Sequence, residues 1–175
     1  MSRALPIWKL TDPDGSLRAS APVVLVRLQE LLDLAESSRD EDNVEALHDL
    51  RIAAKRLRYT MEIFAPALGA EAVELLQTVE ALQERLGAIH DLDVRHVLLL
   101  KSLARERARE QKKADKRTPV RVSAEVGLLP LLAATTEERS GLFGDLQSFW
   151  DASTSEAFAA DLTRLVSGGE TILGE

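Results

Sequence analysis

Apolar residues recur at steps of three and four along much of this chain, and that spacing constrains its fold more than any other feature. Two such series are Leu47, Leu50, Ala54, Leu57, Met61, Phe64 and Leu75, Val79, Leu82, Leu86, Ile89. Because an α-helix completes a turn in 3.6 residues, each series lines one helical face. Aromatic residues make up only 4% of the chain, which favours helices over sheets. We therefore predict an all-α fold, a helical bundle of about six helices.

Residues that begin or break helices divide the chain. The first predicted helix runs from Pro22 to about Ser38, because proline suits a first helical turn. The second begins with an approximate capping box of Asp42 and Glu45 and runs to about Ala65, where Pro66 and Gly69 stop it. A short break at His90–Asp93 separates the next two helices. The remaining predicted helices cover about 70–89, 92–117, 123–152 (broken into two at its glycines and Pro130) and 155–167.

Composition excludes several classes of protein. Residues 1–20 show little periodicity, so we predict a leader there and one helical domain over 21–170. The absence of cysteine excludes disulfides, thiolate metal sites and a cysteine nucleophile. No stretch approaches the ~20 apolar residues of a membrane span, and the first residues lack the apolar core of a secretion signal. These features predict a cytoplasmic protein that makes no contact with membranes.

The charges are segregated along the chain. The net charge of −7 argues against a nucleic-acid or membrane binder. Residues 51–58 nevertheless hold four cations and no anion, and residues 101–121 hold nine cations against three anions. Beyond residue 121 only two cations face nine acidic residues. This segregation predicts that the chain binds an anion locally.

The predicted second helix carries a row of cations beside its apolar face. His48, Arg51, Lys55 and Arg58 follow one another at steps of three, four and three. Because residues one turn apart rise about 5–6 Å along the axis, the row suits a linear anion with repeated charge. Ion pairing with neighbouring helices, or simple solvation, remains an open alternative. A second apolar edge of this helix consists of Ile52, Tyr59 and Ile63. It predicts that the helix packs on two sides and that the cations lie in a groove between them.

Three stretches carry a resemblance to a known family. Residues 47–59 read LHDLRIAAKRLRY, residues 62–64 read EIF, and residues 82–94 read LQERLGAIHDLDV. These resemble the signature of the CHAD family, the conserved-histidine α-helical domain. Weaker likeness continues through Phe149–Trp150 to Leu162, so the resemblance covers about 22–166. It implies a helical bundle with a basic central groove that binds inorganic polyphosphate without catalysis.

The resemblance also implies a set of site residues. The anion-facing set would be His48, Arg51, Lys55, Arg56 and Arg58. Asp91 would be an acidic partner that orients one of the arginines. Supporting positions would be Tyr59, Arg85, His90, Lys101 and Arg105. Members of the family accompany triphosphate-processing enzymes and polyphosphate granules, so such an enzyme is an expected partner and the granule an expected location.

The chain departs from the family pattern in its second half. Residues 135–138 read TTEE where larger members carry cations. The basic arm 101–117, or a second copy in a homodimer, would then complete the groove. Two other functions stay open: a phosphate-ester or polyphosphate hydrolase, and a scaffold that binds acidic protein or nucleic acid through the arm.

Metal and cofactor sites are not predicted. His90 and His96 are six residues apart, a poor helical spacing for two ligands, and no acidic cluster accompanies the three histidines. We therefore expect no metal and no cofactor, and nucleic acid is not favoured as the ligand.

Overall fold

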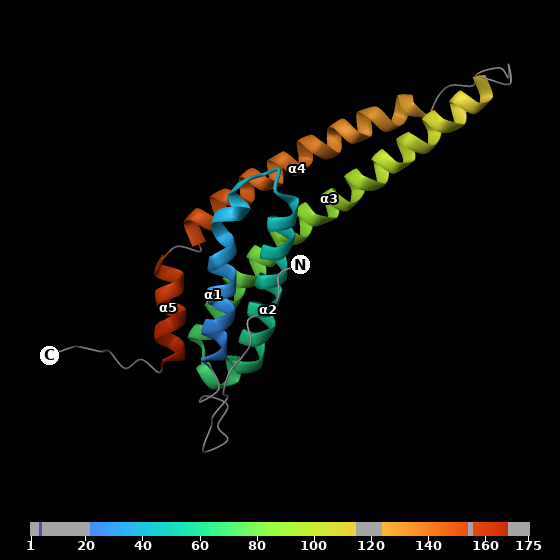
Figure 1. The fold of residues 1–175 in the computed structure, drawn as a ribbon. Coiled ribbons are helices and arrows are strands. Elements are labelled where there is room, and N and C mark those ends of the chain that lie inside the picture. Colours follow the sequence, from blue (N-terminus) through green and yellow to red (C-terminus); the bar gives the residue numbers. More distant parts are fainter. Residues whose placement is uncertain (1–3, 5–21, 115–123, 154–155, 168–175) are drawn as a thin grey trace. The chain divides into compact units, whose positions relative to one another are not determined.

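The computed structural model describes residues 4, 22–114, 124–153 and 156–167, and within them it contains helices and no strand (Figure 1). The elements are α1 (Val23–Ala35), the short 3-10 helix η2 (Glu36–Arg39), α2 (Val44–Leu68), α3 (Glu71–Ala114), α4 (Glu125–Ser153) and α5 (Glu156–Val166). The predicted all-α fold is confirmed, with five α-helices in this described part of the chain where about six were predicted. The predicted leader and the end of the basic arm lie outside the described residues.

Two of the predicted helix breaks are wrong. The helix α3 continues through His90–Asp93, because no proline or glycine interrupts it there and Ile89, Leu92 and Leu103 extend its buried face. The helix α4 also continues, with Pro130 inside it. Pro130 is the sixth residue of α4, so its ring removes one early hydrogen bond and the rest of the helix keeps its own.

The predicted start of α2 is wrong, and of the two residues predicted to stop it, Gly69 is confirmed and Pro66 is not. The N-cap is Asn43, whose side-chain oxygen accepts a hydrogen bond from the backbone N–H of Ala46 at 3.1 Å; the predicted capping box of Asp42 and Glu45 is therefore wrong. Pro66 lies within the helix, which ends at Gly69. Gly69 adopts a φ of +88°, a conformation that glycine takes without steric cost.

The chain forms two compact units. The first comprises the described residues within 1–87 and 145–175, and the second comprises 88–144. In the first unit α1 packs against α2 and α5 (Figure 1). The predicted core face of α2 is confirmed, because all six of its members are buried: Leu47, Leu50, Ala54, Leu57, Met61 and Phe64.

The predicted second apolar edge of α2 is buried only in part. Ile52 is half-buried, whereas Tyr59 is 44% exposed and Ile63 is 62% exposed. Packing of α2 on a second side is therefore not seen at Tyr59 and Ile63 among the described residues.

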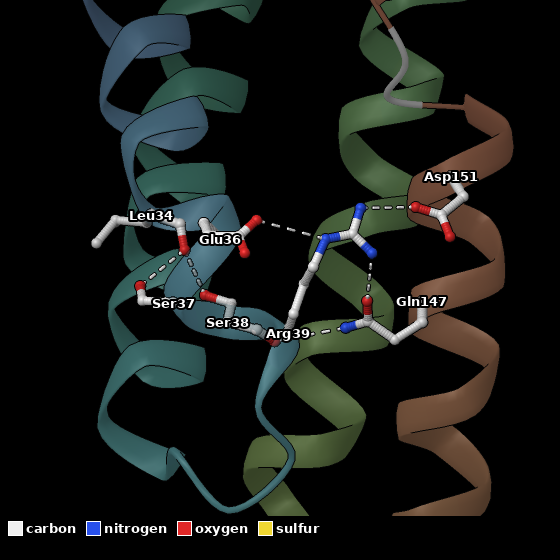
Figure 2. A network of polar contacts seen from close by, with 7 residues as sticks. All are labelled: Leu34, Glu36, Ser37, Ser38, Arg39, Gln147 and Asp151. Carbon is white, nitrogen blue, oxygen red and sulfur yellow. Dashed lines mark hydrogen bonds and ion pairs between the residues drawn. The ribbon is translucent and has the colours of Figure 1, made fainter.

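A polar network in the first unit joins η2 to the end of α4 (Figure 2). Arg39 Nη2 donates a hydrogen bond to Asp151 Oδ1 at 2.8 Å, and Arg39 Nη1 donates to Gln147 Oε1 at 3.4 Å. The Nε2 of Gln147 in turn donates to the backbone carbonyl of Ser38 at 3.4 Å. The hydrogen bond that Arg39 donates to Asp151, and then the negative charge of Asp151, raise the pKa of Arg39 above its usual value. The network thus links η2, which precedes α2 in the chain, to the C-terminal part of α4.

The second unit is an antiparallel pair of helices, formed by α3 from Ala88 onward and by α4 up to Gly144. We call this pair the hairpin. Asp93 of α3 pairs with Arg139 of α4, and Arg107 pairs with Glu125, each at 2.5 Å. Later residues of α3 thus meet earlier residues of α4, as antiparallel helices require. No helix among the described residues is long and apolar enough to span a bilayer.

Candidate functional site

The row of cations that the sequence predicted lies on one uninterrupted stretch of α2, so His48, Arg51, Lys55 and Arg58 do fall along one side of a helix. The rise from the first to the last is about 15 Å. His48, Arg51 and Arg58 are partly buried, and Lys55 is exposed. We call these four residues the α2 row.

Two members of the α2 row lack an ion-pair partner among the residues that the structure describes. Neither Arg51 nor Lys55 forms an ion pair with any residue that the structure describes. For the partly buried Arg51 this is notable, since guanidinium groups removed from water are usually paired. An anion with several negative oxygens would supply the missing partners.

Arg58 of the α2 row also forms an ion pair with a carboxylate on its own helix. Its Nε lies 3.3 Å from Oε1 of Glu62, one turn further along α2. The same Nε is buried and has no hydrogen-bond partner. The Glu62 carboxylate therefore offsets part of the charge of Arg58 and would compete with an arriving anion.

Tyr59 lies against two cations of the row. Its ring centroid is 4.8 Å from the guanidinium carbon of Arg58 and 5.6 Å from Nζ of Lys55. Contacts of this kind are attractive, because the face of an aromatic ring carries negative electrostatic potential. Tyr59, one of the supporting residues predicted from the sequence, thus limits the freedom of Lys55 and Arg58 and holds them near each other.

Arg56 forms an ion pair with a residue of α1. Its Nη1 lies 3.9 Å from Oε2 of Glu30 in α1, and Arg27 Nη1 donates to the other oxygen of Glu30 at 2.5 Å. The Glu30 side chain is only 4% exposed. A buried carboxylate needs positive charge nearby, so Arg56 serves packing between α1 and α2. Sequence reasoning missed Glu30, although its position three residues after Arg27 and between apolar residues of α1 was a usable signal.

Arg85 lies in the first unit and also contacts an aromatic ring. Its guanidinium carbon is 4.0 Å from the ring centroid of Phe149 in α4, and its Nη1 donates to the carbonyl of Ala81 at 2.9 Å. This predicted supporting residue therefore contributes to the contact between α3 and α4 within that unit.

The other predicted supporting residues belong to the hairpin, on α3. Lys101 and Arg105 are exposed there, and neither forms an ion pair with a described residue. Asp91 is exposed and likewise forms no ion pair in the described part of the chain, whereas Asp93 pairs with Arg139. His90 is partly buried.

Two further observations concern charges that the sequence singled out. In the acidic stretch 135–138, Thr135 is buried and Glu138 forms an ion pair with Arg95, so this stretch serves the packing of the hairpin. Across residues 22–114, 124–153 and 156–167, no group of three or more histidines and carboxylates is arranged to hold a metal ion.

The fold and the α2 row together define a protein that is helical in its described residues and carries a row of cations on one helix, and two of these cations, Arg51 and Lys55, form no ion pair with a described residue. A family model for the CHAD domain matches residues 2–100, more than half of the chain. The chain therefore belongs to the CHAD family, which is associated with polyphosphate binding and whose domain is generally a non-catalytic binding domain. The match includes the whole α2 row; the weaker likeness at 149–162 lies beyond it and stays a prediction. No curated protein and no solved structure matches the chain.

Proposed function

We propose that this protein binds inorganic polyphosphate through the α2 row and does not hydrolyse it. The observation that carries the proposal is that Arg51 and Lys55, in line with His48 and Arg58, form no ion pair with any described residue. Membership of a family associated with polyphosphate supports the same ligand.

The geometry of the row favours a linear polyanion over a single phosphate. Successive members are about 5–6 Å apart along the axis, so one phosphate group reaches only one or two of them. Polyphosphate repeats its negative charge along the chain, and one molecule can meet all four members. The arginines bind phosphate oxygens with two parallel hydrogen bonds, and Lys55 adds a compact charge.

The remaining predicted residues take secondary places in the proposal. Arg56 neutralises Glu30, and Tyr59 positions Lys55 and Arg58. The basic supporting residues outside α2 would add long-range attraction or a second wall: Arg85, His90, Lys101 and Arg105. Asp91 would orient one of the arginines. Delivery of the polymer to a triphosphate-processing enzyme in the cytoplasm, at polyphosphate granules, completes the proposal.

Binding of long-chain polyphosphate is expected to weaken steeply with salt. Each contact releases counterions from the polymer, and by analogy with single-stranded nucleic acid four contacts give a slope of roughly −3 when log affinity is plotted against log salt concentration. Titration calorimetry between low and high salt measures the slope. An affinity that does not change with salt would contradict binding by the α2 row.

Replacing Glu62 with Gln is expected to strengthen polyphosphate binding. The change removes the carboxylate that competes for Arg58, along with its repulsion of the polymer. An exposed helical pair of this kind contributes about 0.3–0.5 kcal/mol, so a gain in affinity of roughly twofold is expected. The matched control is Glu45→Gln, which removes one negative charge elsewhere on α2. Equal gains in the two variants would show that only net charge matters.

Incubation with polyphosphate and Mg²⁺ separates binding from hydrolysis. Phosphoryl transfer to water commonly uses metal ions held by carboxylates, and the α2 row supplies cations alone. We expect no free phosphate above the background of polymer incubated without protein, measured by a colorimetric phosphate assay at saturating polymer. Phosphate released in proportion to protein concentration would favour the hydrolase instead.

The exposed cations of α3 support one alternative function. Lys101, Arg105 and Lys112 form no ion pair with the residues described, so they offer a surface for an acidic protein or for nucleic acid. A scaffold of this kind would lose its ligand when these three residues are neutralised and would keep it when the α2 row is neutralised.

A further inference from the structure

An apolar groove runs between α1 and α5 in the first unit. Its walls include three leucines of α1 and three small residues of α5: Leu25, Leu28, Leu32, Ala159, Ala160 and Thr163. Because the α5 side chains are short, they leave about 560 Å³ open beside the leucines. Leu28 is buried, whereas Leu25 and Leu32 are only partly buried. Part of the apolar face of α1 is therefore uncovered in this groove.

The polar side chains at this groove already have partners on their own helices. Gln29 Nε2 donates a hydrogen bond to Asp33 Oδ1 at 2.6 Å, and the Thr163 hydroxyl donates to the backbone carbonyl of Ala159 at 2.7 Å. Arg164, at the edge of the groove, pairs at 2.9 Å with an aspartate one turn before it. Since these groups are paired without a ligand, the groove suits an apolar occupant better than a phosphate or another polar molecule.

Residues 5–10 of this chain have the composition of such an occupant. They read LPIWKL, so five of the six are apolar, and they lie outside the described residues. The indole of Trp8 alone offers about 150–250 Å² of surface for burial. The other end of the chain fits less well, because residues 168–175 hold only two large apolar side chains beside three glycines and two glutamates.

Residues 5–10 also precede one wall of the groove directly. Twelve residues separate them from the start of α1 at Val23, and twelve extended residues span up to about 40 Å. The groove follows α1 from Leu25 to Leu32, a rise of about 10 Å. Exposed apolar side chains of α2 and the hairpin lie further along the chain, so reaching them would close a longer loop at a larger entropic cost. The family match begins at residue 2, so it includes this segment together with α1 and α2.

We propose that residues 5–10 bind in the groove between α1 and α5 and complete the apolar core of the first unit. Binding covers the exposed parts of Leu25 and Leu32 and removes the indole of Trp8 from water in the same step. The segment thereby joins α1 to α5, which lies at the other end of the described chain. This proposal does not rest on polyphosphate binding, and its test uses no polyphosphate.

The fluorescence of Trp8 tests the proposal in the full chain. The chain has two tryptophans, so Trp150→Phe leaves Trp8 as the single indole. We expect acrylamide to quench Trp8 several-fold less in the folded protein than in urea, at every protein concentration. Quenching as strong as in urea overturns the proposal. Protection that appears only as the protein concentration rises would show that the segment binds another copy, and it overturns the proposal as well.

Substitution on α5 then locates the binding site of the segment. In the Trp150→Phe protein, Ala160→Asp places a charge in the groove and should raise the quenching of Trp8 toward its value in urea. The matched control is Ala157→Asp, at an exposed alanine of α5 that does not line the groove, and it should leave the quenching unchanged.

A second groove variant guards against an effect peculiar to Ala160. Thr163→Asp alters another exposed residue of the groove and should also release Trp8. Circular dichroism checks that all the variants keep their helices. If Trp8 is equally protected in the groove variants and in the Ala157→Asp control, the segment binds elsewhere and the assignment to this groove is wrong.

Discussion

Replacing Arg51, Lys55 and Arg58 together with Gln is expected to abolish polyphosphate binding. Charge-assisted contacts to an anion contribute about 1.5–3 kcal/mol each, so three of them account for about 4–9 kcal/mol. That loss removes a micromolar affinity, which corresponds to about 8 kcal/mol. Titration calorimetry at fixed salt measures the result. The variant should stay folded, because none of the three side chains belongs to the buried face of α2.

A matched variant on α3 tests whether position on the fold or charge alone decides affinity. Lys101, Arg105 and Lys112 changed to Gln also remove three positive charges, from exposed positions on the hairpin. Exposed cations act mainly by long-range attraction that salt screens, so binding should weaken only modestly. If the α3 variant loses binding while the α2 variant keeps it, the α2 row is structural and the site lies on α3.

Replacing Arg56 with Met is expected to lower stability while leaving polyphosphate affinity within a few fold. The change withdraws a counter-charge from Glu30, which is buried, and leaves its ion pair with Arg27 in place. Leaving a buried charged group with fewer partners costs about 1–3 kcal/mol in the free energy of unfolding. Urea unfolding followed by circular dichroism measures the cost.

The control for this variant removes the charge on the other side of the pair. Glu30→Gln combined with Arg56→Met leaves no buried carboxylate to neutralise, so the double variant should recover much of the lost stability. An Arg56→Met protein that is as stable as the unmodified chain but has lost its polyphosphate affinity would return Arg56 to the binding set.

Much of the fold could be predicted from local pattern. The steps of three and four identified α2 and its six buried residues, since helical periodicity is a local property of the sequence. The helix ends were harder to predict. Asn43 rather than Asp42 caps α2, and Pro130 lies inside α4, because the energies that decide between neighbouring caps, or retain a proline, are each only about 1–3 kcal/mol and packing can outweigh them.

The sequence by itself determined the α2 row, because the order of residues on a helix fixes which of them share a side. It also determined the family, through the residues around His48 and Leu86. Only the tertiary structure decided how each cation is used: Arg56 neutralises Glu30 of α1, Arg85 stacks on Phe149, and Arg51 has no carboxylate partner among the described residues. The physical reason is that the periodicity of one helix carries no information about which side chain of a distant helix will lie within 4 Å. That proximity decides whether a positive charge is neutralised within the protein or left to bind an anion.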